Sequence, residues 1–277
     1  MTAITAEELK VFSQLIQSLS GILLDQGKGY LLETRLGAWM KELGCASFTE
    51  LHYRIRADAT RKLQRRLIDL ISTNETYFFR DGAPFDLLRH KLLPDLFDRR
   101  SRLGRTGPIR IWSAACSTGQ EAYTIGIILK ELLGDLGKQD IRILGTDISD
   151  QAVAAASRGV FNKVEMGRGL PPGMERHFQA EADGAWRIRD EIRALATFRS
   201  LNLLEPFTGL GRFDLILCRN VAIYFSERDR KGLFDRLGAA LEPEGALVIG
   251  ATESITGLCP QYVSMRYLRS VYYQLAS

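Results

Sequence analysis

The sequence lacks the segments that would anchor a protein in a membrane or direct it across one. No apolar run approaches the roughly 20 residues that a bilayer-spanning helix needs. The first residues, MTAITAEELKVF, contain neither a basic n-region nor an apolar h-region, so we expect no signal peptide. These absences predict a cytoplasmic protein with no membrane insertion.

Cysteine is scarce, and its positions exclude two kinds of site. Cys45, Cys116, Cys218 and Cys259 are scattered over a chain of 277 residues. Disulfide frameworks and structural zinc sites need closely spaced cysteines. We therefore expect buried free thiols in a reducing compartment, and no metal site.

Neither sign of charge is in large excess. The formal net charge of +4 is too small to indicate nucleic-acid binding by itself. Hydrophobic residues make up 45% and charged residues 25%, as in ordinary globular proteins. The length is sufficient for a sizeable core and for two domains.

The first 70 or so residues carry helical patterns and no β pattern. Thr5 with Glu8, and Ser47 with Glu50, have the spacing of capping boxes, and Gly44 suits a helix end. Apolar residues recur at helical spacing in four segments. The segments contain Leu9, Phe12, Ile16 and Leu19; Leu32, Leu36, Trp39, Met40 and Leu43; LHYRIR; and Leu63, Leu67, Leu70 and Ile71.

From about Ile109 short apolar runs alternate with helical stretches. The runs are IRIWSA, IRILGTD, FDLILC and GALVIGA, and the helices are expected over 121–133, 151–158 and 227–241. This alternation predicts a mostly parallel sheet covered on both faces. Residues 160–198 interrupt it and favour an inserted β subdomain. RYLRSVYYQL near the end indicates a final antiparallel strand.

Polar residues follow several of these strands, where open α/β sheets bind ligands. SAACSTGQEAYTIG contains Gly119 but no GxGxxG fingerprint, so it fits either a ligand loop or a tight strand–helix turn. Asp147 ends the second strand, where a carboxylate can accept the hydroxyls of a ribose. Helix capping is the alternative role, although Ser149 is better placed for it. Arg219 and Asn220 follow a later strand in CRNVAIYF.

A further segment, STNETYFFRD at 72–81, admits two interpretations. Asn74-Glu75-Thr76 fits the N-glycosylation pattern, which would indicate an extracellular surface loop. The same segment gathers an amide, hydroxyls, aromatic rings and Arg80, as a ligand site does. A cytoplasmic protein is not glycosylated, which favours the second interpretation.

Together these segments resemble the CheR family of chemotaxis receptor methyltransferases. SAACSTGQEAYTIG, GTDIS, FDLILCRNVAIYF and STNETYFFRD match the family's motifs, SGILLDQGKGYLLETRL matches its helical module, and the similarity covers nearly the whole chain. Family members transfer a methyl group from S-adenosyl-L-methionine to glutamate side chains of bacterial chemoreceptors. The resemblance implies the same reaction here, with S-adenosyl-L-homocysteine as product and sensory adaptation as its role.

The resemblance also implies the organisation of the chain. A small all-helical N-terminal domain (1–72) would recognise the cytoplasmic helical region of the receptors. A Rossmann-like class I methyltransferase domain (73–277) with an antiparallel β subdomain inserted at about 160–198 would bind the cofactor. We expect a monomer.

The family's site residues map onto ten positions of this chain. The resemblance implies that Tyr224 and Arg80 lie at the reaction centre, with Arg80 also contacting the cofactor. Arg80 suits the methionine carboxylate, Asp147 the ribose, and Tyr224 a positioning role. The other implied cofactor contacts are Asn74, Thr76, Glu121, Asn202, Leu203, Arg219 and Asn220.

The chain departs from the family pattern at three places. GQEAYT stands where the family often has GEEPYS, so Gln120 replaces an acid, while Glu121 remains. GATES (250–254) replaces a GHSE-type segment and lacks its histidine but keeps Glu253. HFQAEADGAWRIR is shorter than the loop of members that dock on a receptor pentapeptide, which predicts pentapeptide independence.

A basic stripe between 52 and 66 has two interpretations. It is either a solvated helix face or a docking surface for an acidic partner. Family resemblance favours docking on the receptor. The stripe contains Arg54, Arg56, Arg61, Lys62, Arg65 and Arg66 against the single acid Asp58.

Three rival functions are less well supported. A nucleic-acid methyltransferase commonly has an Asn/Asp-Pro-Pro-aromatic tetrapeptide where this chain has RNVAIYF, and the basic stripe has few aromatics for base stacking. A nicotinamide oxidoreductase would need the missing glycine fingerprint. A non-enzymatic sensor of S-adenosylmethionine stays open, because of the changes at Gln120 and GATES.

Overall fold

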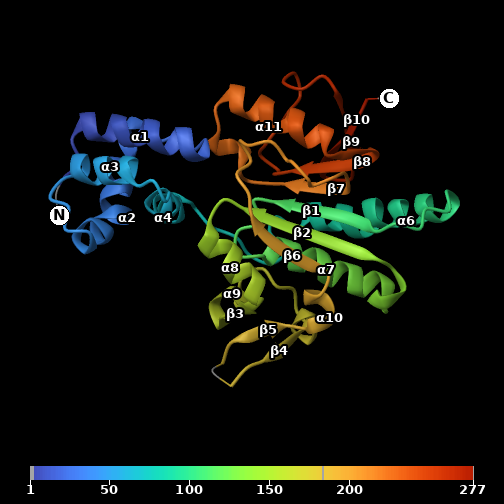
Figure 1. Cartoon of the computed structure of the whole chain (residues 1–277). Coiled ribbons are helices and arrows are strands. Elements are labelled where there is room, and N and C mark those ends of the chain that lie inside the picture. The colour runs from blue at the N-terminus through green and yellow to red at the C-terminus, as the bar shows by residue number, and fades with distance from the viewer. Residues whose placement is uncertain (1–2, 183, 277) are drawn as a thin grey trace.

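The N-terminal segment folds into four helices that share one core (Figure 1). The structure is a computed structural model and describes residues 3–182 and 184–276. Phe12, Leu36 and Leu51 are fully buried at the centre of this core. The predicted helical module is therefore confirmed. Its elements are α1 (Ala6–Ser20), the 3₁₀ turn η1 (Gln26–Lys28), α2 (Gly29–Glu42), α3 (Phe48–Ala57) and α4 (Lys62–Ile71).

Two of these helices, α1 and α3, begin at the predicted capping boxes, and the box at α1 is complete. The Thr5 hydroxyl accepts the Glu8 N–H at 3.2 Å, and the Glu8 carboxylate accepts the Thr5 N–H at 3.0 Å. Ser47 caps α3 through the Glu50 N–H, but the Glu50 carboxylate accepts the N–H of Ala46 instead of that of Ser47. The second box is thus half formed.

A seven-stranded sheet forms the centre of the larger domain (Figure 1). Its order is β6-β2-β1-β7-β8-β10-β9, and the first five strands run parallel. The strands β2 and β6 are added on one side of β1, and the strands from β7 onward lie on its other side. Open α/β sheets bind ligands where the order of addition switches in this way, here between β1 and β7. The strands are β1 (Ile109–Ala114), β2 (Ile141–Asp147), β6 (Ala196–Ser200), β7 (Phe213–Cys218), β8 (Leu241–Ile249), β9 (Tyr262–Tyr267) and β10 (Ser270–Leu275).

Helices cover both faces of this sheet, as the strand–helix alternation predicts. Ile111 of β1 packs on one side and Trp112 on the other, each in its own buried cluster. A helix over 83–102 had not been predicted; it contains one π-helical segment. The first face carries α5 (Ala83–Leu87), the π segment η2 (Leu88–Leu92), α6 (Leu93–Arg102) and α7 (Gln120–Leu133); the second carries α11 (Glu227–Ala239).

The predicted insertion is a separate three-stranded antiparallel sheet, with one correction. The last strand assigned to it, β6, instead pairs with β2 in the main sheet. The two strands are parallel, with Phe198 opposite Gly145. The insertion contains β3 (Val160–Phe161), α9 (Lys163–Gly167), the 3₁₀ turn η4 (Met174–His177), β4 (Phe178–Ala180), β5 (Trp186–Ile188) and α10 (Asp190–Arg193); α8 (Asp150–Arg158) precedes it.

Two predicted boundaries near the C-terminus are wrong. The helix expected to reach Leu241 ends at Ala239, and Leu241 already begins β8. RYLRSVYYQL contains the final strand β10, which joins β8 antiparallel as predicted, but its first residues are the end of β9 and the turn between the two strands.

Two expectations about the whole chain can be compared with the structure. All four cysteines are buried and free, as predicted. Within the described residues, no helix combines the length and the apolar character needed to cross a bilayer.

Candidate active site

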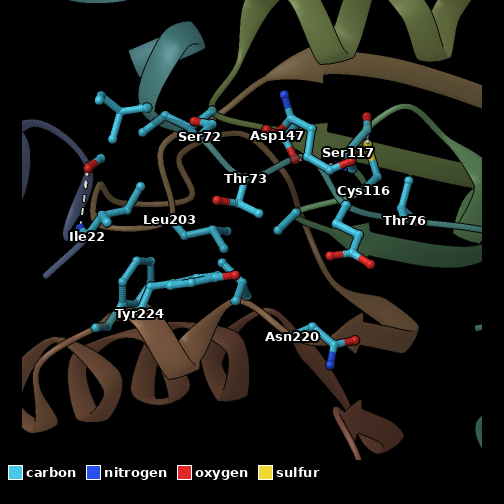
Figure 2. A pocket seen from close by; sticks show the side chains of 18 of the residues that line it. Ile22, Ser72, Thr73, Thr76, Cys116, Ser117, Asp147, Leu203, Asn220 and Tyr224 are labelled. Carbon is cyan, nitrogen blue, oxygen red and sulfur yellow. Dashed lines mark hydrogen bonds between the residues drawn. The ribbon is translucent and has the colours of Figure 1, made fainter. Parts of the chain in front are cut away.

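A pocket lies at the carboxyl ends of β1, β2 and β7, where the N-terminal helices meet the larger domain (Figure 2). All ten residues named by the resemblance line it, so the structure brings the predicted set together. Their roles toward a ligand stay predictions. They come from the segment after α4 (Asn74, Thr76, Arg80), the start of α7 (Glu121), the end of β2 (Asp147), the loop after β6 (Asn202, Leu203) and the loop after β7 (Arg219, Asn220, Tyr224).

Asp147 is fixed by backbone donors at the end of β2. Its two carboxylate oxygens accept the N–H of Ser117 at 2.8 Å and the N–H of Ser149 at 3.0 Å. Burial raises the pKa of Asp147, and these hydrogen bonds act in the opposite direction. Ser149, not Asp147, caps α8, as expected. Asp147 is therefore an oriented acceptor at the cavity wall.

The loop after β1 connects this carboxylate to the segment that follows α4. Ala115 and Ser117 have positive φ angles, so the chain turns sharply before α7. The Ser117 hydroxyl donates to the carbonyl oxygen of Asn74 at 2.9 Å. The half-buried Asn74 of the Asn-x-Thr segment is thus held against the loop that follows β1.

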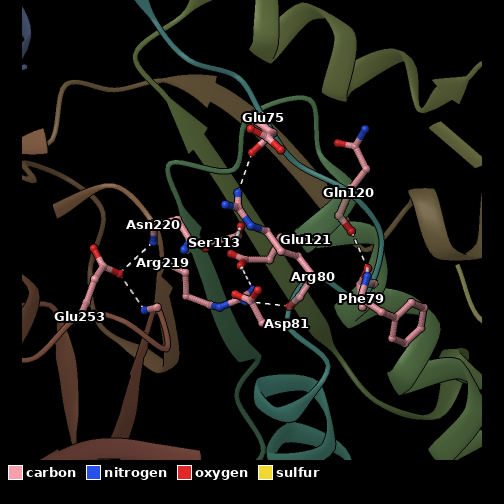
Figure 3. Close-up of polar contacts among 12 residues, drawn as sticks. Glu75, Phe79, Arg80, Asp81, Ser113, Gln120, Glu121, Arg219, Asn220 and Glu253 are labelled. Atoms are coloured by element: carbon pink, nitrogen blue, oxygen red, sulfur yellow. Dashed lines mark hydrogen bonds and ion pairs between the residues drawn. The ribbon is translucent and has the colours of Figure 1, made fainter. Parts of the chain in front are cut away.

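Arg219 is the centre of a buried ionic network (Figure 3). Its side chain is 2% exposed and lies 2.8 Å from the Glu121 carboxylate and 2.9 Å from the Asp81 carboxylate. It also donates to the carbonyl oxygen of Arg80 at 2.8 Å, and Ser113 donates to Glu121 at 2.7 Å. Both terminal nitrogens of Arg219 are therefore occupied by protein groups, so it fixes the loops around the cavity.

Arg80 lies where this network meets the β subdomain. One terminal nitrogen donates to the carbonyl oxygen of Glu75 at 2.6 Å, and the guanidinium lies 5.8 Å from the Tyr77 ring. Arg168 contacts the same ring at 4.6 Å and pairs with the Glu75 carboxylate at 2.5 Å. Within the described residues the other terminal nitrogen of Arg80 forms no hydrogen bond, which leaves it able to bind an anionic group.

The loop after β6 joins the N-terminal helices to the pocket. The side-chain amide of Asn202 donates to the carbonyl oxygen of Leu19 at 2.9 Å and accepts the Leu204 N–H at 3.0 Å. Gly21 has a φ of 77°, and a Cβ there would lie 3.0 Å from the Phe225 ring. The Asn202 side chain thus serves the domain contact, and Leu203 supplies the adjacent apolar wall.

Tyr224 is half-buried, and its side chain extends into the cavity (Figure 2). Its carbonyl oxygen accepts the N–H of Leu23 at 2.9 Å. The connection after α1 therefore positions the segment that carries this tyrosine.

Several lining residues were not assigned to the site from the sequence. Ile22, Lys28, Leu31 and Arg35 belong to the N-terminal module and line the same pocket. Arg35 donates to the carbonyl oxygen of Ile71 and, at 3.3 Å, to the Thr73 hydroxyl. The quoted segment SGILLDQGKGYLLETRL contains these four residues, but its apolar periodicity is explained equally well by a helix core.

Family models match both parts of this architecture. The model described as CheR methyltransferase, all-alpha domain, matches residues 7–72, and CheR methyltransferase, SAM binding domain, matches residues 74–269. The chain belongs to the CheR methyltransferase family. This CheR protein is therefore an S-adenosylmethionine-dependent methyltransferase with the predicted fold class.

Curated relatives are similar over nearly their whole length. Chemotaxis protein methyltransferase 1 of Pseudomonas aeruginosa is 36% identical over 279 residues, covering 99% of each chain. The chemotaxis protein methyltransferase of Vibrio parahaemolyticus is 36% identical and covers 99% of this chain and all of the relative. That of Borreliella burgdorferi is 36% identical over 92% of this chain and 90% of its own.

The pocket has the chemistry that S-adenosylmethionine requires. Asp147 could accept hydrogen bonds from ribose hydroxyls, and Leu203 could provide an apolar surface for a base, since both residues line the pocket. Arg80 has a terminal nitrogen that could donate to a carboxylate, and Glu121 lines the same pocket while pairing with Arg219. The residues present therefore fit the cofactor.

Proposed function

We propose that this protein methylates glutamate side-chain carboxylates in the cytoplasmic helical region of bacterial chemoreceptors. The products are glutamate methyl esters and S-adenosyl-L-homocysteine, and the reaction serves sensory adaptation. The observation that carries the proposal is the position of the pocket. Both the methyltransferase domain and the N-terminal module line it, so a protein bound to the module would reach the transferable methyl group.

The residues of the pocket account for catalysis without a general base. S-adenosylmethionine supplies an electrophilic methyl group on a sulfonium centre. A glutamate side chain is already ionised at neutral pH, and none of the described residues that line the pocket is a histidine. Tyr224 and Arg80 would orient the incoming carboxylate, and correct alignment can lower a barrier by about 7 kcal/mol or more. The apolar residues of the lining, among them Leu203, would lower the polarity around the reacting groups and so favour a reaction in which opposite charges are neutralised.

Two residues of the basic stripe, Arg54 and Arg65, are engaged by acids of this chain and are left out of the docking face that we propose. Arg54 pairs with Glu50 at 2.7 Å, and Arg65 lies 3.8 Å from Asp150 of the larger domain. Within the described residues, no ion pair is formed by the rest of the stripe, which we propose as the receptor-docking face: Arg56, Arg61, Lys62 and Arg66.

Further parts of the proposal concern the setting of the reaction. We propose domain limits of 1–72 and 73–277, a cytoplasmic location, a monomeric state and no dependence on a receptor pentapeptide. The last point is supported by the short connection between β4 and β5, in which Glu181 pairs with Arg187 at 2.5 Å. Titration with peptides from receptor C-termini tests it, since saturable binding would contradict independence.

The decisive experiment for the proposed function uses S-adenosylmethionine labelled on its methyl group. Purified protein is incubated with a receptor cytoplasmic fragment, and the volatile methanol released by alkali is counted. Carboxyl methyl esters release methanol under alkali, whereas N-methyl groups do not. Asp147→Ala should lower the transfer about tenfold or more, because a hydrogen-bonded charged acceptor is lost.

Each alternative has its own result. Alkali-stable label would indicate a methyl acceptor other than a carboxylate and contradict the proposal. Cofactor binding without label on any receptor fragment would favour a sensing role.

A further inference from the structure

The carboxylate of Glu253 joins the ends of two neighbouring strands beside the pocket (Figure 3). A single oxygen, Oε2, accepts the N–H of Gly250 at 2.7 Å and the N–H of Asn220 at 2.8 Å. These donors follow the ends of β8 and β7, which pair in parallel with Cys218 opposite Ile249. Glu253 itself does not line the pocket.

Asn220 has a backbone conformation that needs such support. Its φ is 58°, a left-handed value that residues other than glycine adopt at an energetic cost. Asn220 follows Arg219 and lines the cofactor pocket. The N–H–carboxylate bond fixes the peptide group that sets the direction of this side chain.

Gly250 leaves the space that the hydrogen bond between the Asn220 N–H and Glu253 requires. A Cβ on Gly250 would lie 2.5 Å from Oε2 of Glu253 and 3.1 Å from the Asn220 nitrogen. Only glycine leaves room for the shared acceptor at this position. The second oxygen, Oε1, is buried and has no hydrogen-bond partner among the described residues. The contact with the two N–H groups is therefore the interaction that holds this carboxylate in place.

We infer that Glu253 is a positioning residue for methyl transfer, which holds Asn220 in its left-handed conformation and so preforms the cofactor wall. The required property is a hydrogen-bond acceptor at the position of Oε2, not negative charge. This inference rests on the proposed role of Asn220 in cofactor binding and is independent of which protein is methylated.

Three substitutions of Glu253 test separately its hydrogen-bond acceptor, the length of its side chain and its negative charge. Glu253→Gln keeps an acceptor on a side chain of the same length, and Glu253→Asp keeps the charge on a shorter side chain. Glu253→Ala removes the acceptor and the charge. Gly250→Ala displaces the carboxylate without changing it. Thr252→Ala, at an exposed position in the same turn, is the matched control. S-adenosylmethionine affinity is measured calorimetrically on the full chain without receptor, and unfolding temperature confirms that each variant is folded.

We expect Glu253→Ala, Glu253→Asp and Gly250→Ala to weaken cofactor binding about tenfold or more, because two partly buried N–H groups lose their acceptor. Glu253→Gln should remain within about threefold of the parent protein, like Thr252→Ala. Parent-like affinity in folded Glu253→Ala and Glu253→Asp would overturn the inference. So would a Glu253→Gln variant that loses as much affinity as Glu253→Ala, since charge would then be the required property.

The readout separates this inference from the proposed function. Cofactor affinity reports on Glu253 even if no receptor is methylated, and receptor methylation by the parent protein reports on the function even if Glu253 has no effect.

Discussion

At the scale of single residues, burial and hydrogen bonding act on Asp147 in opposite directions, and burial is the larger effect on its pKa. Because its pKa in the fold lies above that of the unfolded chain, its contribution to folding stability is greatest at low pH. That contribution is lost as the pH rises through the raised pKa. The pH dependence of cofactor binding has the opposite sign. Affinity should be higher at high pH, because the ionised carboxylate is the better acceptor for hydroxyl groups.

Cofactor affinity should therefore fall with decreasing pH, beginning above the range of an ordinary aspartate. Below the raised pKa the dissociation constant should increase about tenfold per pH unit, as expected for one linked proton. Calorimetric titrations of the parent protein and Asp147→Asn at several pH values test this. An unchanged slope in Asp147→Asn would assign the pH dependence to another group.

Tyr224 provides a second prediction at this scale. Tyr224→Phe should lower kcat about tenfold through poorer orientation of the acceptor, with cofactor affinity nearly unchanged. Its pH–rate profile should keep the shape of the parent protein's, since no base is removed. A titration step lost from the profile would instead indicate proton transfer by the phenol.

At the scale of elements, the Arg219 network ties the end of β7 to the start of α7 and to the segment after α4. Breaking a buried ion pair by removing one partner costs about 3–5 kcal/mol, because the other charge stays buried. Arg219→Met should lower the free energy of unfolding by about that amount. Arg219→Met with Glu121→Gln should be more stable than Arg219→Met alone.

Equilibrium denaturation of the two variants measures both values. A loss below about 1 kcal/mol in Arg219→Met, the range of exposed pairs, would contradict the buried network.

The elements themselves were largely predictable, because their patterns are local. Apolar runs located β1, β2, β7 and β8, and the polar residues after β1, β2 and β7 lie in one pocket. The pairing of β6 with the main sheet was not predictable, since nothing in ATFRS distinguishes a strand of the insertion from a strand beside β2. The hairpin β9–β10 was missed because YLRS carries no Gly, Asn or Asp turn signal.

The partners of site residues were less predictable than their positions. The side chain of Asn202 contacts Leu19, and Arg219 contacts Glu121, over separations of 183 and 98 residues. Such contacts arise from docking of whole elements, which no local pattern encodes. The sequence therefore indicated that these polar residues belong to the site, but not that Arg219 and Asn202 are engaged by protein groups.

At the scale of the whole molecule, the N-terminal module carries two cations, Arg56 and Lys62, that do not line the pocket. Arg56 and Lys62 are exposed and free of ion pairs within the described residues. Charge reversal of both should lower methyl transfer to a receptor fragment about tenfold at low salt, with less effect at high salt. Arg65 is left unchanged because it pairs with Asp150.

The control for this prediction reverses two exposed cations that form no ion pair within the described residues and precede the start of β1 and β2, Arg102 and Lys138. Cofactor affinity should be unchanged in both double variants. Equal loss of transfer in the control would show that net charge, and not the docking face, is responsible.

The central claim is that the methyl acceptor is a glutamate carboxylate of a chemoreceptor. Peptide-fragmentation mass spectrometry of a receptor cytoplasmic fragment, treated with this protein and S-adenosylmethionine, identifies the modified atom group most directly. We predict methyl groups on glutamate side chains of the helical region, at a level about tenfold or more lower after treatment with Asp147→Ala. Methylation confined to lysine, arginine or histidine would contradict the claim.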